Sequence, residues 1–524
     1  MNGERVFHSK KALRLITNSF FPHKHALLGD MESSMRQARR ALALPDHPAA
    51  PTPPPNPRRL SAIVAPLKKH PQAVIFALAL ALRLGWVLTL DSHLTWIDER
   101  EFATIAQHLA QGDGYLSSSY RANPMLPSYL QFVFLLFGQH YVVARIGQSL
   151  VGAVTCVLMY QLASLLIGPV AALLSGLLLA VYPPHIYLAG VFYVDCLLTF
   201  FCALAVCLTV VAQRARRHVE LGFLCGVSLG LTALTRPVFL VCVPCVALAW
   251  LWAGRQAFRR RLLACSVLLL GCGLTILPWT IRNYRVYRRP VLISSGFYTM
   301  LWRGNNELAT GGPDDRVFTW HTPAWQERLQ RVPEERRRTL EAQFQMVDRL
   351  ISDREESSGD GSLSMDDVLK PLAIEAVVSH PGRTLVLMLK KVRTLFNAFS
   401  DTLTENQDTT RRNRLLAALS FYPVLTLALI GAALGWPRRR ELALIYLVIA
   451  SVIGSYALLT ACTRFRLPID PYLIVFASLA LETGWAALTS GVWAARVAQW
   501  RGPVVVGKPS VPSAVVTKTG TDSL

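Results

Sequence analysis

The stretch that decides the fold is PQAVIFALALALRLGWVLTL (residues 71–90), followed closely by TWIDEREF (residues 95–102). The first stretch is almost entirely apolar and has the length, about 20 residues, with which a helix crosses a bilayer. The second stretch places the carboxylates of Asp98, Glu99 and Glu101 soon after this membrane segment. We therefore expect three acidic side chains at, or close to, a membrane surface.

Apolar segments of this kind recur along the whole chain. Hydrophobic residues make up 52% and charged residues 17% of the 524 residues, and both fractions depart from those of soluble domains in the direction of membrane proteins. The sequence thus predicts an all-α polytopic membrane protein with about 10 transmembrane helices, in a range of roughly 9–12. The predicted spans are 71–90, 145–167, 169–189, 195–213, 220–235, 237–254, 262–282, 413–435, 441–460 and 468–487.

The distribution of basic residues predicts the orientation. The net charge is +21, but no basic face with interleaved aromatic residues indicates a nucleic-acid partner. Short basic connections at 214–217, 255–261 and 438–440 fall on one side of the ten spans, together with the N-terminus. The positive-inside rule makes that side cytoplasmic. The opposite, extracytoplasmic side then carries Asp98, Asp195, the long polar loop and the segment Arg464-Phe465-Arg466.

The chain divides into tails and one membrane domain. Residues 1–70 are basic and rich in proline and lack the apolar region of a signal peptide, so we predict a disordered cytoplasmic tail. A wrongly chosen upstream start site would produce the same pattern. The predicted membrane domain is 71–487, with a first outer loop at 91–140 and a large outer loop at 283–411. Residues 488–524 are predicted to be a cytoplasmic C-terminal tail.

The first outer loop contains two predicted interfacial helices. From Phe102 to Ala110 the apolar residues follow helical spacing, which is typical of a short amphipathic helix on a membrane surface. Residues 126–138 are apolar but short for a span, so we assign them to a second interfacial helix. If 126–138 crossed the membrane instead, the basic connections would no longer all lie on one side.

The ten cysteines lie mostly inside apolar segments, where they are expected to pack as small hydrophobic residues. We therefore expect neither a disulfide framework nor a thiolate zinc site. No clear set of metal ligands is visible, so a divalent-metal cofactor has no support in the sequence.

The acidic residues allow two interpretations. Asp98 with Glu101 resembles a capping box, and Asp195 could cap the helix that follows it. However, an acid at the edge of the hydrocarbon is costly unless it is paired or used. Outer helix ends also carry arginines, whose planar groups suit phosphate: Arg145, Arg236, Arg282, Arg464 and Arg466. A carboxylate base beside cations that stabilise a leaving phosphate is the chemistry of sugar transfer from a polyprenyl phosphate.

Several short motifs occur in a specific order along 71–487. They are Asp98-Glu99-x-x-Phe102, Gly112-x-Gly114-Tyr115, Asn123-Pro124-Met125-Leu126-Pro127, Ala144-Arg145, Tyr182-Pro183-Pro184 before Asp195, Leu234-Thr235-Arg236-Pro237, Pro278-Trp279-x-x-Arg282-Asn283-Tyr284, Trp302-x-Gly304-Asn305-Asn306 and Arg464-Phe465-Arg466-Leu467-Pro468. In this order the chain resembles the GT-C class of polytopic membrane glycosyltransferases. It is similar in particular to the bacterial relatives of protein O-mannosyltransferases and lipid A aminoarabinose transferases.

The resemblance implies a hexosyl or pentosyl transferase of the bacterial inner membrane. Its donor would be a polyprenyl-phosphate sugar, its acceptor a protein, lipid or glycan, and the reaction would invert the anomeric centre. Asp98 would be the general base, and Asp195 would be a second acidic residue that supports the acceptor or the base. We leave Glu99 as an orienting or structural neighbour of Asp98. Many relatives carry a basic residue where this chain has Asn123, and Arg121 could replace it.

The remaining site predictions follow from the same motifs. We assign the donor phosphate to Arg464, Arg466, Arg121 and Arg282, and the substrate to Tyr115, Trp302, Asn305 and Asn306. The alternative function is a secondary transporter of an anionic solute or lipid. Transporters usually carry charged or broken sites near the midplane and related halves. Here the acids lie at span ends and the two halves show no repeat.

Overall fold

The structure is a computed structural model that describes residues 69–490, except 92, 116–122, 216, 255, 317–320, 359–360 and 399–410. Over these residues every regular element is a helix and no strand occurs. The prediction of an all-α polytopic membrane protein is therefore confirmed for this part of the chain. The predicted tails lie outside the described residues, apart from the few positions that adjoin the first and last helices.

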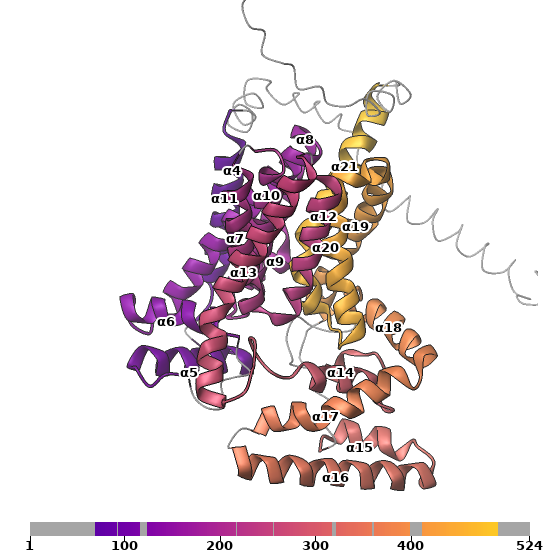
Figure 1. Cartoon of the computed structure of the whole chain (residues 1–524). Coiled ribbons are helices and arrows are strands. Elements are labelled where there is room, and N and C mark those ends of the chain that lie inside the picture. The colour runs from indigo at the N-terminus through magenta and orange to yellow at the C-terminus, as the bar shows by residue number, and fades with distance from the viewer. Residues whose placement is uncertain are drawn as a thin grey trace, which may run out of the picture. The chain divides into compact units, whose positions relative to one another are not determined.

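The N-terminal half of the bundle is a set of long apolar helices (Figure 1). They are α4 (Pro71–Val87), α7 (Tyr141–Leu166), α8 (Pro169–Val181), α10 (Asp195–Ala212), α11 (His218–Thr235) and α13 (Phe258–Tyr287). Glycines allow α11 and α13 to approach closely. A Cβ on Gly226 would lie 2.0 Å from the carbonyl oxygen of Leu268, and one on Gly271 would lie 2.6 Å from that of Phe223. Small residues at such contacts are how helices pack inside a membrane.

The other helices of the bundle are α12 (Cys242–Ala253), which packs on α20, and α19 (Arg411–Gly435), α20 (Arg439–Leu458) and α21 (Asp470–Ser490). The 3-10 turn Trp436–Arg438 joins α19 to α20, and across this turn the Tyr446 hydroxyl donates a 2.6 Å hydrogen bond to the carbonyl of Ala432. Helix α21 packs on α19 at Gly431, where a Cβ would lie 1.8 Å from the carbonyl oxygen of Phe476.

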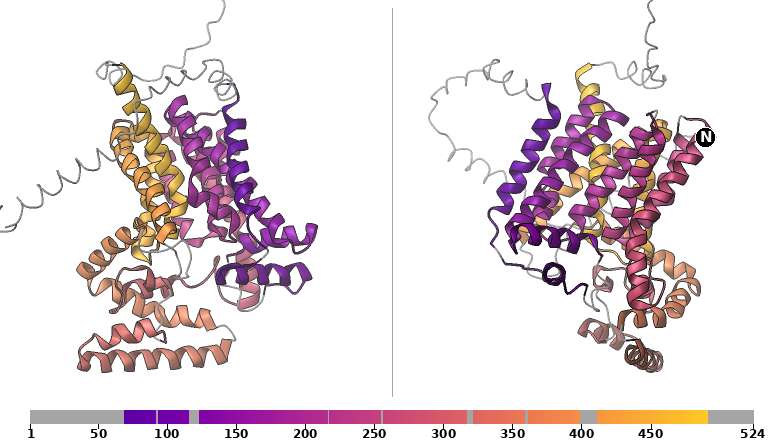
Figure 2. Two further views of the ribbon diagram at one scale, coloured as in Figure 1. Left: turned by 180° about the vertical axis from the view of Figure 1, so that it is seen from behind. Right: turned by 60° about the vertical axis from the view of Figure 1, so that its left-hand side comes forward.

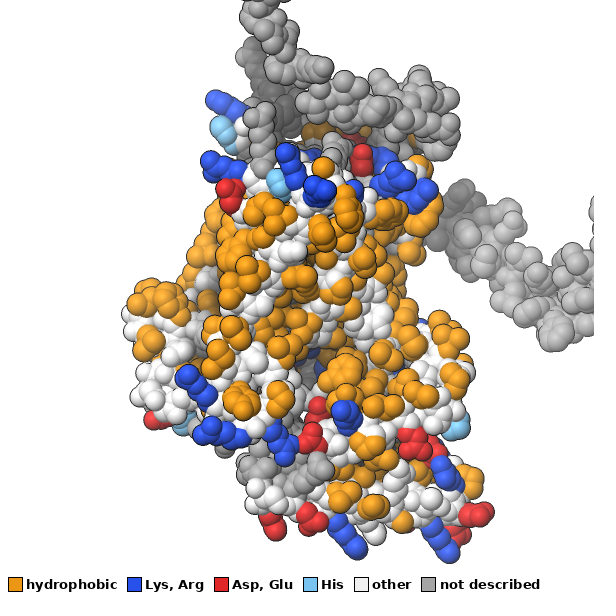
Figure 3. All heavy atoms as spheres, viewed as in Figure 1, with side chains coloured by type: hydrophobic (Ala, Val, Ile, Leu, Met, Phe, Trp, Pro, Cys, Tyr) orange, Lys and Arg blue, Asp and Glu red, His pale blue; other side chains and the backbone are white. Residues whose placement is uncertain are grey.

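Among the described residues, five helical stretches are long and apolar enough to cross a membrane, or up to seven if each bent pair counts as one span. One of the five, Arg414–Leu458, comprises both α19 and α20. Each of the ten predicted spans coincides with helix, although some helices are short. The predicted span 169–189 is broken after α8, with a bend of 54° before α9 (Pro183–Tyr187), because two consecutive prolines lack backbone N–H groups. Figure 3 shows a belt of apolar side chains, with Lys and Arg gathered at its upper end.

Helices α5 (Ile97–Gln111) and α6 (Met125–Phe137) pack against each other at the lower end of the bundle (Figures 1 and 2). Helix α6 leaves four large apolar side chains more than half exposed, namely Phe132, Leu135, Leu136 and Phe137. This exposure fits an interfacial helix over 126–138, and its position in a membrane stays a prediction.

The described part of the long polar loop contains five α-helices and one short 3-10 helix, Pro313–Arg316. The α-helices are α14 (Phe297–Asn305), α15 (Pro323–Gln330), α16 (Glu334–Ser358), α17 (Gly361–Val378) and α18 (Pro381–Leu395). A separate apolar core joins the first four of them, α14 to α17, and in it Trp302 and Trp325 both pack edge-on against Phe344. The most charged part of this loop forms α16, and α18 returns the chain to the bundle.

Candidate active site

Asp98 lies inside the first turn of α5. The helix begins at Ile97, and Trp96 is the residue before it. The side chain of Glu99 accepts hydrogen bonds from the backbone N–H groups of Thr95, at 3.1 Å, and Trp96, at 3.2 Å. The alternative in which Asp98 and Glu101 form the capping box is therefore wrong, because Glu99 satisfies the N-terminal donors. The carboxylate of Asp98 is thereby left for other contacts.

Glu99 also ties α5 to the chain that precedes α10. Its second oxygen accepts a 2.9 Å hydrogen bond from the backbone N–H of Phe192, and its side chain is buried. Burial raises the pKa of Glu99, while the N–H groups of Phe192, Trp96 and Thr95 oppose this rise. The contact with Phe192 holds the segment before Asp195 against the turn that carries Asp98.

Arg464 joins the two predicted catalytic acids. It lies in the 3-10 helix Thr463–Ile469, and its Nη1 donates to Asp98 at 2.8 Å while its Nε donates to Asp195 at 2.7 Å. Burial lowers the pKa of Arg464, but the charges of Asp195 and Asp98 more than offset this and raise the pKa above its usual value. Arg464 is therefore the bridge of a buried ion cluster.

Arg236 completes this cluster, although the predicted site residues did not include it. Its Nη1 donates to the other oxygen of Asp195 at 3.1 Å. Asp195 is fully buried, and each of its oxygens faces a guanidinium group rather than the N–H groups of its own helix. Two carboxylates and two guanidinium groups thus balance one another's charge. The motif Leu234-Thr235-Arg236-Pro237 and the outer position of Arg236 were the signals that could have identified it.

Aromatic rings hold the two arginines in place. The guanidinium carbon of Arg464 lies 3.5 Å from the centre of the Tyr193 ring, and that of Arg236 lies 4.3 Å from the centre of the Phe465 ring. Cations over aromatic faces at these distances are attracted by the ring quadrupole. The rings therefore restrict how far either arginine can move.

Asp98 is the accessible acid of the cluster. One third of its side chain is exposed, 33%, compared with 0% for Asp195. Its Oδ2 receives the bond from Arg464, while no described group donates to Oδ1. Asp98 can therefore reach a bound molecule, and Asp195 cannot do so without rearrangement of the cluster.

Arg466 points into a second buried cluster. Its Nε donates to Asp470 at 3.0 Å, and its guanidinium carbon lies 3.3 Å from the centre of the Phe421 ring. The Tyr182 hydroxyl donates to the other oxygen of Asp470 at 3.1 Å. The assignment of Arg466 to a donor phosphate stays a prediction, but here the arginine binds α18, α19 and α21 together.

Arg282 and Tyr115 meet in an aromatic cage. The guanidinium carbon of Arg282 lies 5.0 Å from the ring centre of Trp279, 5.2 Å from that of Tyr115 and 5.4 Å from that of Tyr287. Its Nη1 donates to the side chains of Asn283 and Tyr287 at 3.1 Å. Unlike Arg464 and Arg466, Arg282 forms no ion pair with a described carboxylate. Arg121 lies outside the described residues.

The predicted substrate residues of α14 are buried. Trp302, Asn305 and Asn306 are at most 4% exposed. The amide of Asn305 donates to the carbonyls of Leu301 and Leu458, both at 2.8 Å, and that of Asn306 donates to Trp302 at 3.1 Å. These donors are therefore occupied by the backbone, and the structure does not bring them together with Asp98.

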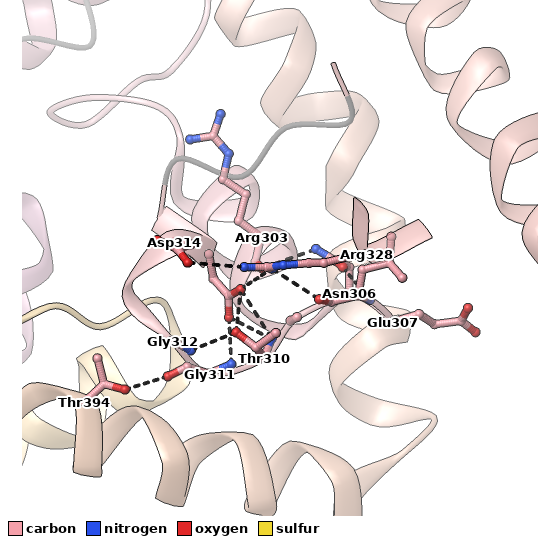
Figure 4. Close-up of polar contacts among 12 residues, drawn as sticks. Arg303, Asn306, Glu307, Thr310, Gly311, Gly312, Asp314, Arg328 and Thr394 are labelled. Carbon is pink, nitrogen blue, oxygen red and sulfur yellow. Dashed lines mark hydrogen bonds and ion pairs between the residues drawn. The ribbon is translucent and has the colours of Figure 1, made fainter. Parts of the chain in front are cut away.

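A polar network surrounds the chain that follows α14 (Figure 4). The buried carboxylate of Asp315 accepts from Arg328 at 2.6 Å and from the N–H of Gly311 at 2.7 Å. Buried Lys391 donates to the Asn305 side chain at 3.1 Å and to the Leu458 carbonyl at 3.2 Å. Burial lowers the pKa of Lys391 to about 8, with Asp315 opposing this shift. The network fixes the loop to the end of α20, a few residues before Arg464.

Over the described residues, no group of three or more His, Cys, Asp or Glu side chains could hold a metal ion. Nine of the ten cysteines are buried and Cys245 is half-buried.

Comparison with known proteins identifies the middle of the chain. Residues 121–281 match the sequence model of a family described as dolichyl-phosphate-mannose-protein mannosyltransferase. The chain carries a domain of this glycosyltransferase family. The domain includes Asp195 and Arg236, whereas Asp98 and Arg464 lie on either side of it. No curated protein matches the sequence.

Solved structures of two proteins, AglB and ArnT, are similar to the chain. The archaeal oligosaccharyltransferase AglB from Archaeoglobus fulgidus, in complex with an inhibitory peptide and a dolichol-phosphate, is 15% identical, with a TM-score of 0.49; the match covers 83% of this chain and 54% of that one. ArnT from Cupriavidus metallidurans in the apo state is 16% identical, with a TM-score of 0.36 and coverage of 79% and 78%. ArnT bound to undecaprenyl phosphate has a TM-score of 0.34, with the same identity and coverage. The chain thus spans about half the length of the oligosaccharyltransferase.

Proposed function

We propose that this chain is an integral membrane glycosyltransferase that moves a sugar from a polyprenyl-phosphate donor to an acceptor hydroxyl, with Asp98 as the general base. The observation that carries the proposal is the state of Asp98: a partly exposed carboxylate with one oxygen held by Arg464 and the other without a described donor. The glycosyltransferase domain at 121–281 supports the reaction class. Undecaprenyl phosphate, which is bound in one ArnT structure, is a polyprenyl phosphate.

In the proposed reaction the acceptor oxygen attacks the anomeric carbon from the face opposite the phosphate. The bond from that carbon to the phosphate oxygen breaks, its electron pair leaves with the polyprenyl phosphate, and the configuration inverts. The acceptor proton passes to Oδ1 of Asp98, which must lie within hydrogen-bond reach of the hydroxyl. Arg464 orients Asp98, and Asp195 with Arg236 orients Arg464. Asp195 therefore acts indirectly, by positioning Arg464. Glu99 holds the turn that carries Asp98 against the segment before Asp195.

The donor phosphate needs a cation that stabilises the leaving group. Among the proposed residues, Arg464 and Arg466 already pair with described carboxylates. Arg282 has no described carboxylate partner, is half-buried and is oriented by three rings, so we favour it as the principal phosphate ligand. Arg121 stays in the proposal as a second phosphate ligand, because it follows Tyr115 closely in the sequence and Tyr115 contacts Arg282.

We further propose that the site faces the extracytoplasmic side of the bacterial inner membrane. The contacts of Arg464 with Asp98 and Asp195 put three of the outer residues at one end of the bundle. At the other end, Arg438 donates to the carbonyl of Leu166, the last residue of α7. This separation matches the positive-inside orientation and also disfavours a transporter, whose charged site would lie near the midplane.

The test is sugar transfer by the purified chain in proteoliposomes that contain a polyprenyl-phosphate sugar. Asp98→Asn should abolish transfer while the protein still inserts and folds. Full transfer by Asp98→Asn would overturn the assignment of the base. Solute or lipid uptake by the wild type without any transfer would favour the transporter.

A further inference from the structure

Helix α18 has one face buried in the protein and one face that the described structure leaves uncovered. The buried face carries Thr384, Leu387, Lys391 and Leu395. On the other side the exposed fractions are 58% for Leu385, 51% for Val386 and 64% for Leu389. With 3.6 residues per turn these three side chains fall within an arc of about 100°. They form an apolar stripe along the helix.

The charges of α18 are all positive. Its sequence, PGRTLVLMLKKVRTL, contains four basic residues and no acidic residue. Arg383 and Lys391 turn inward and donate to backbone carbonyls of the loop and of α20. Lys390 and Arg393 are exposed beside the stripe and form no ion pair with the described residues. An apolar stripe flanked by unpaired cations is typical of a helix that lies in a membrane interface.

The position of α18 places this stripe at the end of the bundle. Lys391 bonds to the carbonyl of Leu458, the last residue of α20. Phe396, directly after α18, stacks on Phe421 of α19 with ring centres 6.3 Å apart. Near that contact α19 exposes Leu415, Leu416 and Leu419 by more than half. The apolar surface of a bundle helix thus lies next to the end of α18.

We propose that the exposed face of α18 lies in the bilayer interface and binds anionic phospholipid. Leu385, Val386 and Leu389 enter the boundary of the acyl chains, while Lys390 and Arg393 reach the headgroup phosphates along their aliphatic stems. A second protein is a weaker match for this surface, because stable interfaces use about 20–30 residues a side and the stripe belongs to one helix of 15 residues. The proposal does not depend on the reaction that the chain catalyses.

The test is the accessibility of a single introduced thiol in the full-length chain, with one chain in each lipid nanodisc. Leu389→Cys is the probe, and Met346→Cys on α16 is the matched control, because the wild-type side chains are 64% and 62% exposed. A water-soluble maleimide reports the labelling rate, and the wild-type chain gives the background from its ten cysteines. The discs contain either phosphatidylcholine alone or a mixture with phosphatidylglycerol.

In discs with phosphatidylglycerol, Leu389→Cys should react about tenfold more slowly than Met346→Cys, since insertion of one leucine-sized group removes it from water. Adding Lys390→Glu and Arg393→Glu to Leu389→Cys should restore rapid labelling, as should discs without the anionic lipid. Equal labelling of the two probes in every lipid would overturn the proposal. Slow labelling of Leu389→Cys that does not respond to lipid charge or to the two Glu substitutions would also overturn it and would favour a protein cover.

Discussion

Asp98 and Asp195 differ in burial, and this difference predicts unequal losses of stability from the same substitution. In Asp195→Asn, the Arg464 and Arg236 guanidinium groups lose the buried charge that both of them contact, at 2.7 and 3.1 Å. Removal of one partner from a buried ion pair costs about 3–5 kcal/mol, because the remaining charge is left uncompensated. In Asp98→Asn, the substituted side chain is one third exposed, so water can solvate the vacated side of Arg464. The expected loss of stability is then about 1 kcal/mol or less.

The rate of sugar transfer should follow stability in Asp195→Asn but not in Asp98→Asn. Removal of a general base costs about 10²–10⁴-fold in rate, so Asp98→Asn should be nearly inactive at almost native stability. Asp195→Asn should lose activity together with stability. The assay pairs thermal unfolding in detergent with sugar transfer in proteoliposomes for both variants and for Glu101→Gln, an acid of the same α5 helix, as control. A destabilised Asp98→Asn beside a stable Asp195→Asn would refute the division of roles that burial implies.

Three further substitutions test the packing around the site. Glu99→Ala removes the acceptor of three backbone N–H groups and should reduce both stability, by roughly 1–3 kcal/mol, and transfer, whereas unchanged transfer would disconnect Glu99 from the site. The pKa of Lys391 is about 8 in the folded chain and 10.5 in the unfolded chain, so between these pH values the unfolded chain binds more protons at this side chain. The free energy of unfolding should therefore rise with pH across this window, by up to about 3 kcal/mol. Lys391→Met should lack this rise in pH-dependent melting, and an identical rise in the variant would contradict the assignment. Gly226→Leu should prevent α11 from packing on α13, seen as loss of folded protein after extraction, while Gly273→Leu, where a Cβ meets no atom within 4 Å, should be tolerated.

The sequence alone determined the helices. Apolar runs of membrane length, bounded by basic connections, predict nearly every helix of the bundle, since each span must satisfy its own backbone hydrogen bonds. The bend after Tyr182 also has a local cause, the two prolines that follow. In the same way the sequence identified Asp98, Asp195 and Arg464 as residues of one end of the bundle.

The tertiary structure decided which of these residues meet. Arg464 lies 366 residues from Asp98 along the chain, and no local pattern can pair residues at that separation. Glu99 rather than Asp98 accepts the N-terminal N–H groups of α5, and its other oxygen accepts the N–H of Phe192 in the loop before α10. Arg466 and Arg464 are two residues apart, yet they enter different clusters because a 3-10 helix directs them to different carboxylates. Charge and periodicity predict the side of the membrane and the type of group. The choice of partner depends on which buried carboxylates and carbonyls the packed helices leave to be paired.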